Sequence, residues 1–251
     1  MPIISIRFYQ ELNDFLPPHM RTEFQTEFAA GCTVKALIED LGVPHTEVDL
    51  ILADGKSVGF SHRLSDGERL SVYPVFESWD IGRLTKVRPR PLRVTRFICD
   101  VHLGKLSSLL RLFGFDSEYG NDLDDEELLA ISLARGRIIL TRDRGLLKRR
   151  EATHGYCVRS TRPKVQVKEV MRRFDLAGQV QPFSLCITCN EKLVRVPKTE
   201  ILSLIPPLVA DRYEVFSRCP HCARIFWRGT HWERMKKFAD EVLGGLGAER
   251  F

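Results

Sequence analysis

Two pairs of cysteines constrain the fold of this chain more than any other feature of its sequence. Each pair encloses two residues, and the four members are Cys186, Cys189, Cys219 and Cys222. Thiolates at this spacing, with a longer loop between the pairs, are typical of tetrahedral zinc sites. Disulfides or four unrelated buried thiols are the alternatives, but the total of seven cysteines is odd and no secretory signal is present. The pattern therefore predicts a zinc ribbon in the C-terminal part of the chain.

Composition sets the broad class of protein. Hydrophobic residues make up 43% of the 251 residues, which excludes a disordered chain and is enough for folded cores. No apolar run approaches the roughly 20 residues that cross a bilayer, so we expect no membrane partner. The first residues, MPIISIRFYQEL, lack the basic-then-apolar layout of a signal peptide. We therefore expect a cytoplasmic protein.

The charge is distributed unevenly. Residues 1–80 contain six Lys and Arg against thirteen Asp and Glu, a net charge of −7, whereas residues 81–251 carry +12. Such a split predicts two parts with different partners. The basic part suits a polyphosphate such as RNA, and a basic surface that serves only solubility is the alternative.

Residues 1–80 have the pattern of a small β-rich domain. ISIRFYQEL alternates like a half-buried strand, helical spacing follows at 34–41, and VDLILADGKSV runs into a turn at Asp54 and Gly55 before RLSVYPVF. This order resembles the β-grasp, or ubiquitin-like, fold. Sulfur carriers of that fold end in Gly-Gly, and FESWDIGR stands here instead. We expect a binding or regulatory unit for an unidentified protein partner, with a packing role as the alternative.

The segment after this domain predicts a linker and then an α/β domain. IGRLTKVRPRPLRVTR, residues 81–96, carries six basic residues and two prolines, so we expect a basic linker over 81–93, either solvated or in contact with phosphates. Residues 94–160 alternate apolar strand patterns with helical ones, and both predicted helices end at a glycine, Gly114 or Gly136. This alternation predicts a parallel sheet with crossover helices.

Three aspartates fall where such a sheet binds ligands. Asp100 and Asp143 follow predicted strands, and Asp125 lies in the first turn of the helix between them, on its apolar face. Asp124 forms a capping pattern with Glu127. Carboxylates that converge need a hard cation, so the spacing predicts a Mg²⁺ or Mn²⁺ site that activates water. The alternative is that Asp100 and Asp143 are turn or cap residues.

A family resemblance joins these features. RFICDVHLGKLSSLLRLFGFD, DDEELLAISLARGRIILTRDRGLLKR and the two cysteine pairs resemble the PIN-like ribonucleases named after the C-terminal domain of Mut-seven. The resemblance implies a β-grasp domain over 1–80, a PIN-like nuclease domain over 94–180, and a zinc ribbon with a C-terminal helix over 181–251. It assigns the acidic positions to Asp100, Asp125 and Asp143, and an L-R motif to Leu110 and Arg111. Asp122 and Asp124 are the candidates for a fourth acid, and His102 stands where the family usually has an apolar residue.

Basic and aromatic residues add a predicted RNA-binding surface. Arg142, Arg144 and Lys148 lie close to Asp143 in sequence and can position phosphate. After the second cysteine pair, Trp227, Arg228 and His231 begin a run that interleaves aromatic rings with cations, a combination that binds single-stranded RNA. Packing of the tryptophans against the ribbon is the alternative, and His231 is also a further candidate metal ligand.

The sequence thus predicts a multidomain α/β and α+β protein that acts as a metal-dependent ribonuclease with structural zinc. A non-catalytic RNA-binding adaptor, in which the β-grasp domain recruits a partner, is the alternative. A phosphatase is a weaker one, because His102 stands where a second aspartate is usual. The RNA substrate, the endo- or exonucleolytic mode and the oligomeric state are not indicated.

Overall fold

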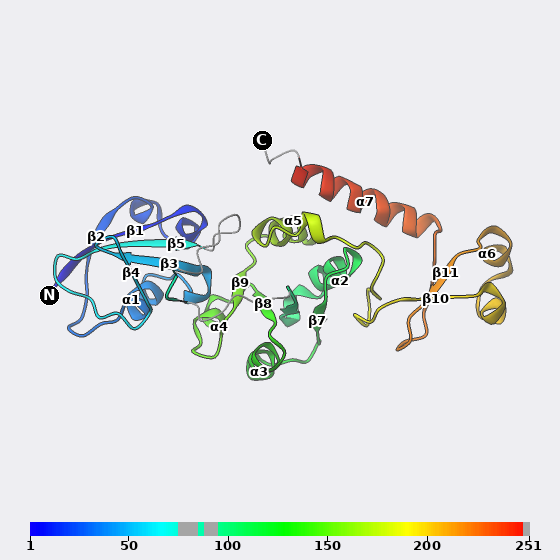
Figure 1. Cartoon of the computed structure of the whole chain (residues 1–251), viewed down its shortest axis with the longest axis horizontal. Coiled ribbons are helices and arrows are strands. Elements are labelled where there is room, and N and C mark those ends of the chain that lie inside the picture. Colours follow the sequence, from blue (N-terminus) through cyan, green and yellow to red (C-terminus); the bar gives the residue numbers. More distant parts are fainter. Residues whose placement is uncertain (75–84, 88–94, 248–251) are drawn as a thin grey trace. The chain divides into compact units, whose positions relative to one another are not determined.

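The computed structural model describes residues 1–74, 85–87 and 95–247 (Figure 1). Residues 81–84 and 88–93 of the predicted basic linker lie outside these ranges. The chain forms two units that do not follow its linear order. The first contains Met1–Thr95 and Leu123–Val158, and the second contains Arg96–Asp122 and Arg159–Phe251. The predicted domain boundaries therefore stay a prediction, and each unit is described by itself.

The first unit begins with a five-stranded sheet in the order β2-β1-β5-β3-β4. Strands β1 and β5 are parallel and the other pairs antiparallel. The elements are β1 (Ile3–Phe8), η1 (Gln10–Phe15), η2 (Pro18–Met20), β2 (Phe24–Glu27), α1 (Val34–Asp40), η3 (His45–Glu47), β3 (Val48–Ala53), β4 (Lys56–Val58) and β5 (Arg69–Pro74). The predicted β-grasp arrangement is confirmed. Asp54 and Gly55 both have positive φ, 46° and 78°, as the two-residue turn between β3 and β4 requires.

The rest of the first unit comes from the middle of the chain. It contains α3 (Asp125–Arg135), β8 (Ile138–Thr141), α4 (Arg144–Lys148) and β9 (Gly155–Cys157). Helix α3 ends at Gly136 in the left-handed region, with φ 58°, as the sequence predicts. Strands β8 and β9 are parallel, and β8 is buried along its whole length.

The second unit holds the other parallel pair. Strands β6 (Phe97–Cys99) and β7 (Ser117–Tyr119) are joined through α2 (Gly104–Leu112), and α5 (Pro163–Arg173) packs on α2. The side chains of Leu106, Leu110 and Phe113 are fully buried, so the predicted apolar face of α2 is confirmed. The strand pairs of the central residues, β8–β9 in the first unit and β6–β7 in the second, are thus both parallel and accompanied by helices, as expected.

The C-terminal part of the second unit is a three-stranded antiparallel ribbon in the order β10-β11-β12. Its elements are η5 (Ala177–Gln179), β10 (Val194–Val196), η6 (Lys198–Glu200), η7 (Leu202–Leu204), α6 (Pro207–Arg212), β11 (Phe216–Arg218), β12 (Ile225–Trp227) and α7 (Thr230–Gly247). A small core of Ile201, Ile205 and Phe216 supports it. Helix α7 contacts α5, and the Phe238 ring lies 6.1 Å from that of Phe113. None of the described helices combines the length and apolar character needed to span a bilayer.

Candidate functional site

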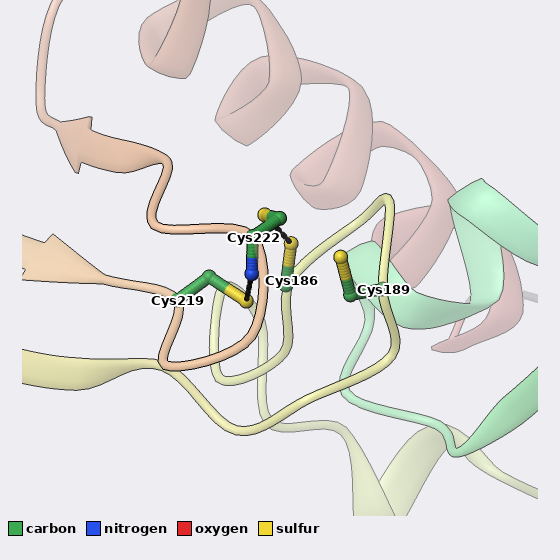
Figure 2. A group of neighbouring side chains, drawn as sticks. All are labelled: Cys186, Cys189, Cys219 and Cys222. Carbon is green, nitrogen blue, oxygen red and sulfur yellow. Dashed lines mark hydrogen bonds between the residues drawn. The ribbon is translucent and has the colours of Figure 1, made fainter.

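The four cysteines of the two pairs come together at one point of the second unit (Figure 2). Their sulfur atoms all lie within 4.8 Å of one another, and the Sγ atoms of Cys186 and Cys222 are 3.8 Å apart. A tetrahedral site with Zn–S distances of about 2.3 Å places its sulfurs about 3.8 Å apart. All seven cysteines are free thiols. The cluster can therefore hold a metal ion, and its donor set and spacing fit zinc better than a disulfide arrangement.

Two loops with the same hydrogen-bonding pattern present these cysteines. In each, the first cysteine donates its N–H to the carbonyl oxygen five residues later and accepts the N–H of the residue four positions later. The groups are Cys186 with Glu191 and Asn190, and Cys219 with Arg224 and Ala223, at 2.7 to 3.0 Å. Asn190 and Ala223 close the loops with φ angles of 68° and 59°, in the left-handed region. The backbone thus fixes both cysteine pairs in equivalent geometries.

The sulfurs differ in their affinity for protons. A hydrogen bond from the backbone N–H of Arg224 lowers the pKa of Cys222 to about 7. Burial, assisted by the neighbouring sulfurs, raises the pKa of Cys189 to about 12, and burial also raises the pKa of Cys186. Four crowded sulfurs cannot all be ionised without a cation, because like charges repel, so some of them keep their protons. A bound divalent cation would displace those protons.

Arg111 of α2 joins the first cysteine loop to the parallel strands. Its side chain is buried; Nε donates to the carbonyl oxygen of Ser117 at 2.8 Å, and Nη1 donates to those of Ile187 and Thr188 at 3.2 and 2.7 Å. Ile187 and Thr188 are the two residues enclosed by the first cysteine pair. Burial lowers the pKa of the guanidinium, and nearby sulfurs oppose that effect. Arg111, which the resemblance assigns to a family motif, thus positions the first cysteine loop.

Asp100 lies in the second unit, directly after β6. Its carboxylate is buried, with 7% of the residue exposed, and Oδ1 accepts the N–H of His102 at 2.7 Å as the N-cap of η4 (Val101–Leu103). The imidazole of His102 is largely exposed, with Nδ1 3.5 Å from the same oxygen. A carboxylate at this end of a parallel strand stands where such sheets bind ligands.

Asp143 lies in the first unit, two residues after β8. Its Oδ1 accepts the N–H of Gly145 at 2.7 Å and its own N–H donates to Thr141 Oγ1 at 2.9 Å. It therefore caps α4, and both Asp143 and Asp100 have the capping role that the sequence left open. Capping occupies one carboxylate oxygen of each residue, which leaves metal binding chemically compatible with it. Asp100 belongs to the second unit, whereas Asp125 and Asp143 belong to the first, and the three-carboxylate site stays a prediction.

The acidic residues near α3 differ in their hydrogen bonds and in the part that the sequence predicted for them. Asp124 and Glu127 form the predicted capping box, with N–H to carboxylate distances of 2.8 and 3.2 Å. Asp125 is the first residue of α3 and is exposed, so the expectation that its carboxylate points into the protein is wrong. The reason is that the apolar face of α3 becomes buried only from Leu128 onward. Asp122 is exposed in the preceding turn.

The cations near Asp143 make contacts within the first unit. The Arg144 guanidinium carbon lies 4.9 Å from the centroid of the Phe15 ring, and Lys148 Nζ donates to the carbonyl oxygen of Glu39. Phe15 and Glu39 belong to the β-grasp fold, which therefore packs against α4. Arg142 is exposed beside Asp143. RNA binding by these three cations stays a prediction.

Helix η3 adds to the contact between the β-grasp fold and the later segment of the first unit that contains α4 and β9. His45 Nε2 lies 2.9 Å from the carbonyl oxygen of Ala152, and a carboxylate oxygen of Glu47 accepts the N–H of Cys157 at 2.5 Å. Glu47 is fully buried. The packing role that the sequence allowed for the N-terminal domain is thus present within the first unit, and its predicted protein partner is untested.

The residues predicted to bind RNA after the second cysteine pair differ in their surroundings. Trp227 packs against the ribbon core, and a Cβ atom on Gly229 would lie only 2.8 Å from its Nε1, so Trp227 has the core position that was the alternative. Arg228 is exposed, with its guanidinium carbon 5.4 Å from the centroid of the Trp232 ring. His231 is exposed at the start of α7 and is not a member of the cysteine cluster.

Sequence reasoning missed the residues that attach the cysteine loop. Asn190 donates through Nδ2 to Asp116 Oδ1 at 2.5 Å and accepts the N–H of Ser117 at 3.0 Å. An asparagine directly after a Cys-x-x-Cys pair is a usable signal, because asparagine tolerates the left-handed backbone conformation. No local pattern indicates that Arg111 reaches residues 76 and 77 positions away.

Comparisons with known proteins agree with this arrangement. The family model of the Mut7-C RNAse domain matches residues 95–239, and that of the Mut7-C ubiquitin domain matches residues 1–80. A human protein named "Exonuclease mut-7 homolog" is 27% identical over 158 residues, which cover 61% of this chain and 16% of the relative. The chain therefore spans about a sixth of that protein's length. No solved structure matches the chain significantly. These findings support a nuclease-type function.

Proposed function

This chain belongs to the Mut7-C RNAse domain family, and on that premise we propose that it is a metal-dependent ribonuclease acting on single-stranded RNA. The observation that carries the proposal is the family match over residues 95–239, together with aspartates after two strands of the parallel sheet, Asp100 and Asp143. Fold and family alone indicate a nuclease, whereas the aspartates supply a chemical basis for hydrolysis.

In this proposal Asp100, Asp125 and Asp143 hold Mg²⁺ or Mn²⁺, which prefer oxygen ligands. Such a cation, when bound, would supply an activated water and charge stabilisation for the leaving oxygen of a phosphodiester. The protein's own part is to fix the carboxylates. Thr141 Oγ1 and the Gly145 N–H orient Asp143, and the His102 N–H orients Asp100. Preset carboxylates bind a cation without an additional ordering cost.

The second metal in the proposal is a structural zinc ion bound by the four clustered cysteines. Four thiolates complete its coordination, so no position is left open for a substrate. Its binding energy would stabilise a ribbon whose buried hydrophobic cluster, among the described residues, is as small as Ile201, Ile205 and Phe216. The zinc would therefore support the fold and take no part in hydrolysis.

The test is cleavage of a labelled single-stranded RNA by purified protein with and without added Mn²⁺. EDTA would also remove zinc, so chelated protein must be reloaded separately with Zn²⁺ alone and with Zn²⁺ plus Mn²⁺. The proposal expects cleavage only when Mn²⁺ or Mg²⁺ is present. Zinc-loaded protein that binds RNA but never cleaves it would favour the non-catalytic adaptor instead.

A further inference from the structure

A pocket of about 480 Å³ opens on the second unit, where the ribbon strands meet the start of α7. Pockets of about 300 to 1,000 Å³ accommodate small molecules, so this one fits a nucleotide rather than a folded segment. Its described lining includes no Asp or Glu. The side chains that matter to its chemistry are aromatic or cationic: Phe183, Phe226, Trp227, Trp232, Arg195 and Arg228.

Phe183 and Trp232 form an aromatic wall of this pocket. Their ring centroids are 5.1 Å apart and their planes are inclined by 36°. Phe183 has a φ angle of 62°, which a bulky side chain seldom adopts. A hydrogen bond of 2.9 Å from its N–H to the carbonyl oxygen of Leu112, the last residue of α2, holds it there. Strained backbone of this kind is concentrated at binding sites, and here it directs an aromatic ring toward Trp232.

Two arginines give the pocket its charge. Arg228 is exposed and its guanidinium carbon stands 5.4 Å from the centroid of the Trp232 ring, while Arg195 of β10 is also part of the wall. An aromatic wall beside guanidinium groups matches a base with its phosphate, because the base stacks and the phosphate accepts charge-assisted hydrogen bonds. An apolar protein segment would leave both arginines without a complementary anion.

We propose that this pocket captures one unstacked base, with an adjoining phosphate, of single-stranded RNA. Trp232 and Phe183 supply the stacking surface, and Arg228 and Arg195 bind the phosphate. Trp227 lines the pocket and packs against the ribbon core. The inference rests on the proposed function, since it names how the ribonuclease selects unpaired RNA. A duplex keeps its bases stacked in the helix and cannot present one to the pocket.

The test is RNA binding by the full chain carrying Asp143→Asn, which the proposed function expects to prevent cleavage. Binding is measured by fluorescence anisotropy without a chelator. The probes are a short labelled single strand and the same strand annealed to its complement. Trp232→Leu should weaken single-strand binding about tenfold, and Trp232→Phe should stay within about twofold. Duplex binding should not change. Wild-type affinity of a folded, zinc-loaded Trp232→Leu protein for the single strand would overturn the proposal, as would equal losses for strand and duplex.

Two exposed cations provide a second test, because replacing an exposed side chain usually changes stability little. Arg228→Gln and Lys237→Gln each remove one exposed cation, but only Arg228 lines the pocket. Arg228→Gln should reduce single-strand affinity several-fold more than Lys237→Gln, and equal effects would contradict the proposal. The two proposals can fail separately. If the wild-type protein binds RNA through Trp232 but never cleaves it, the proposed ribonuclease activity is refuted and the pocket proposal stands. If it cleaves RNA but binds it independently of the pocket, the pocket proposal is refuted and the ribonuclease activity stands.

Discussion

Nη1 of Arg111 lies 2.7 Å from the carbonyl oxygen of Thr188, so the buried guanidinium of this α2 residue holds the loop that presents Cys186 and Cys189, two of the four clustered cysteines. The same side chain bonds the carbonyl oxygen of Ser117 at the start of β7. The cysteine cluster and the α2–β7 region are therefore joined by hydrogen bonds within the second unit, and a change in one should be measurable at the other.

Replacing Arg111 should weaken metal retention. Arg111→Met leaves three carbonyl oxygens without this donor, and loss of such buried bonds typically costs about 1–3 kcal/mol. We expect lower stability to guanidinium chloride and faster zinc release to a chromogenic chelator. The control is Arg212→Met on the exposed surface of α6, and equal zinc-release rates for both variants would contradict the connection.

Loss of one cysteine should release the metal altogether. Cys219→Ser removes a thiolate from a set of four, and incomplete tetrahedral sites bind zinc far more weakly. We expect about one zinc per chain in the wild type and almost none in the variant, measured by mass spectrometry, with most of the far-ultraviolet circular dichroism retained. Cys32→Ser, which changes a thiol of the β-grasp fold, should keep its zinc. A zinc-free wild-type protein would refute the assignment.

Glu47 should stabilise the contact between the β-grasp fold and β9. Glu47→Ala removes the fully buried acceptor of the Cys157 N–H, so we expect a loss of about 2 kcal/mol in the free energy of unfolding. The matched control is Glu126→Ala, whose side chain is 83% exposed and 3.8 Å from Arg149; it should change stability by less than about 0.5 kcal/mol. Similar values for both variants would show that the buried carboxylate contributes little.

Local patterns predicted much of the fold. Alternation and turn chemistry identified most strands of the β-grasp sheet, the spacing of cysteines predicted their cluster, and Asp124 with Glu127 predicted a capping box. Local patterns leave several elements unindicated, among them the short strands β2 and β7 and the helices α4, α5 and α6. The strands are three or four residues long with half-buried, partly polar faces, so periodicity has too little length to indicate them.

The candidate site was predictable only in part, because its support comes from distant segments. Position after a strand identified Asp100 and Asp143, yet nothing local showed that Arg144 and Lys148 contact the β-grasp fold. Helical spacing placed Asp125 on the apolar face, but a first-turn residue has no preceding turn to pack against and is exposed here. Tertiary contacts, which a linear pattern does not encode, decided these outcomes.

Asp124 and Asp143 both cap helices, and comparing them should separate an effect on folding from an effect on catalysis. Asp124→Ala breaks the capping box and should cost about 1 kcal/mol in stability, with cleavage reduced far less than by a change at Asp143. Thermal unfolding and cleavage rates measured on the same samples would check this. Complete loss of cleavage by a stable Asp124→Ala protein would instead identify Asp124 as the fourth acid.

The most direct measurement is the rate of single-stranded RNA cleavage by Asp143→Asn in Mn²⁺. Asparagine caps helices about as well as aspartate, so the acceptor for the Gly145 N–H survives while one negative metal ligand is lost. The account predicts unchanged unfolding, zinc content and RNA affinity, with cleavage lowered at least about a hundredfold, as expected when a metal-dependent step loses several kcal/mol of stabilisation. Cleavage at the wild-type rate would contradict a metal-dependent aspartate site at Asp143.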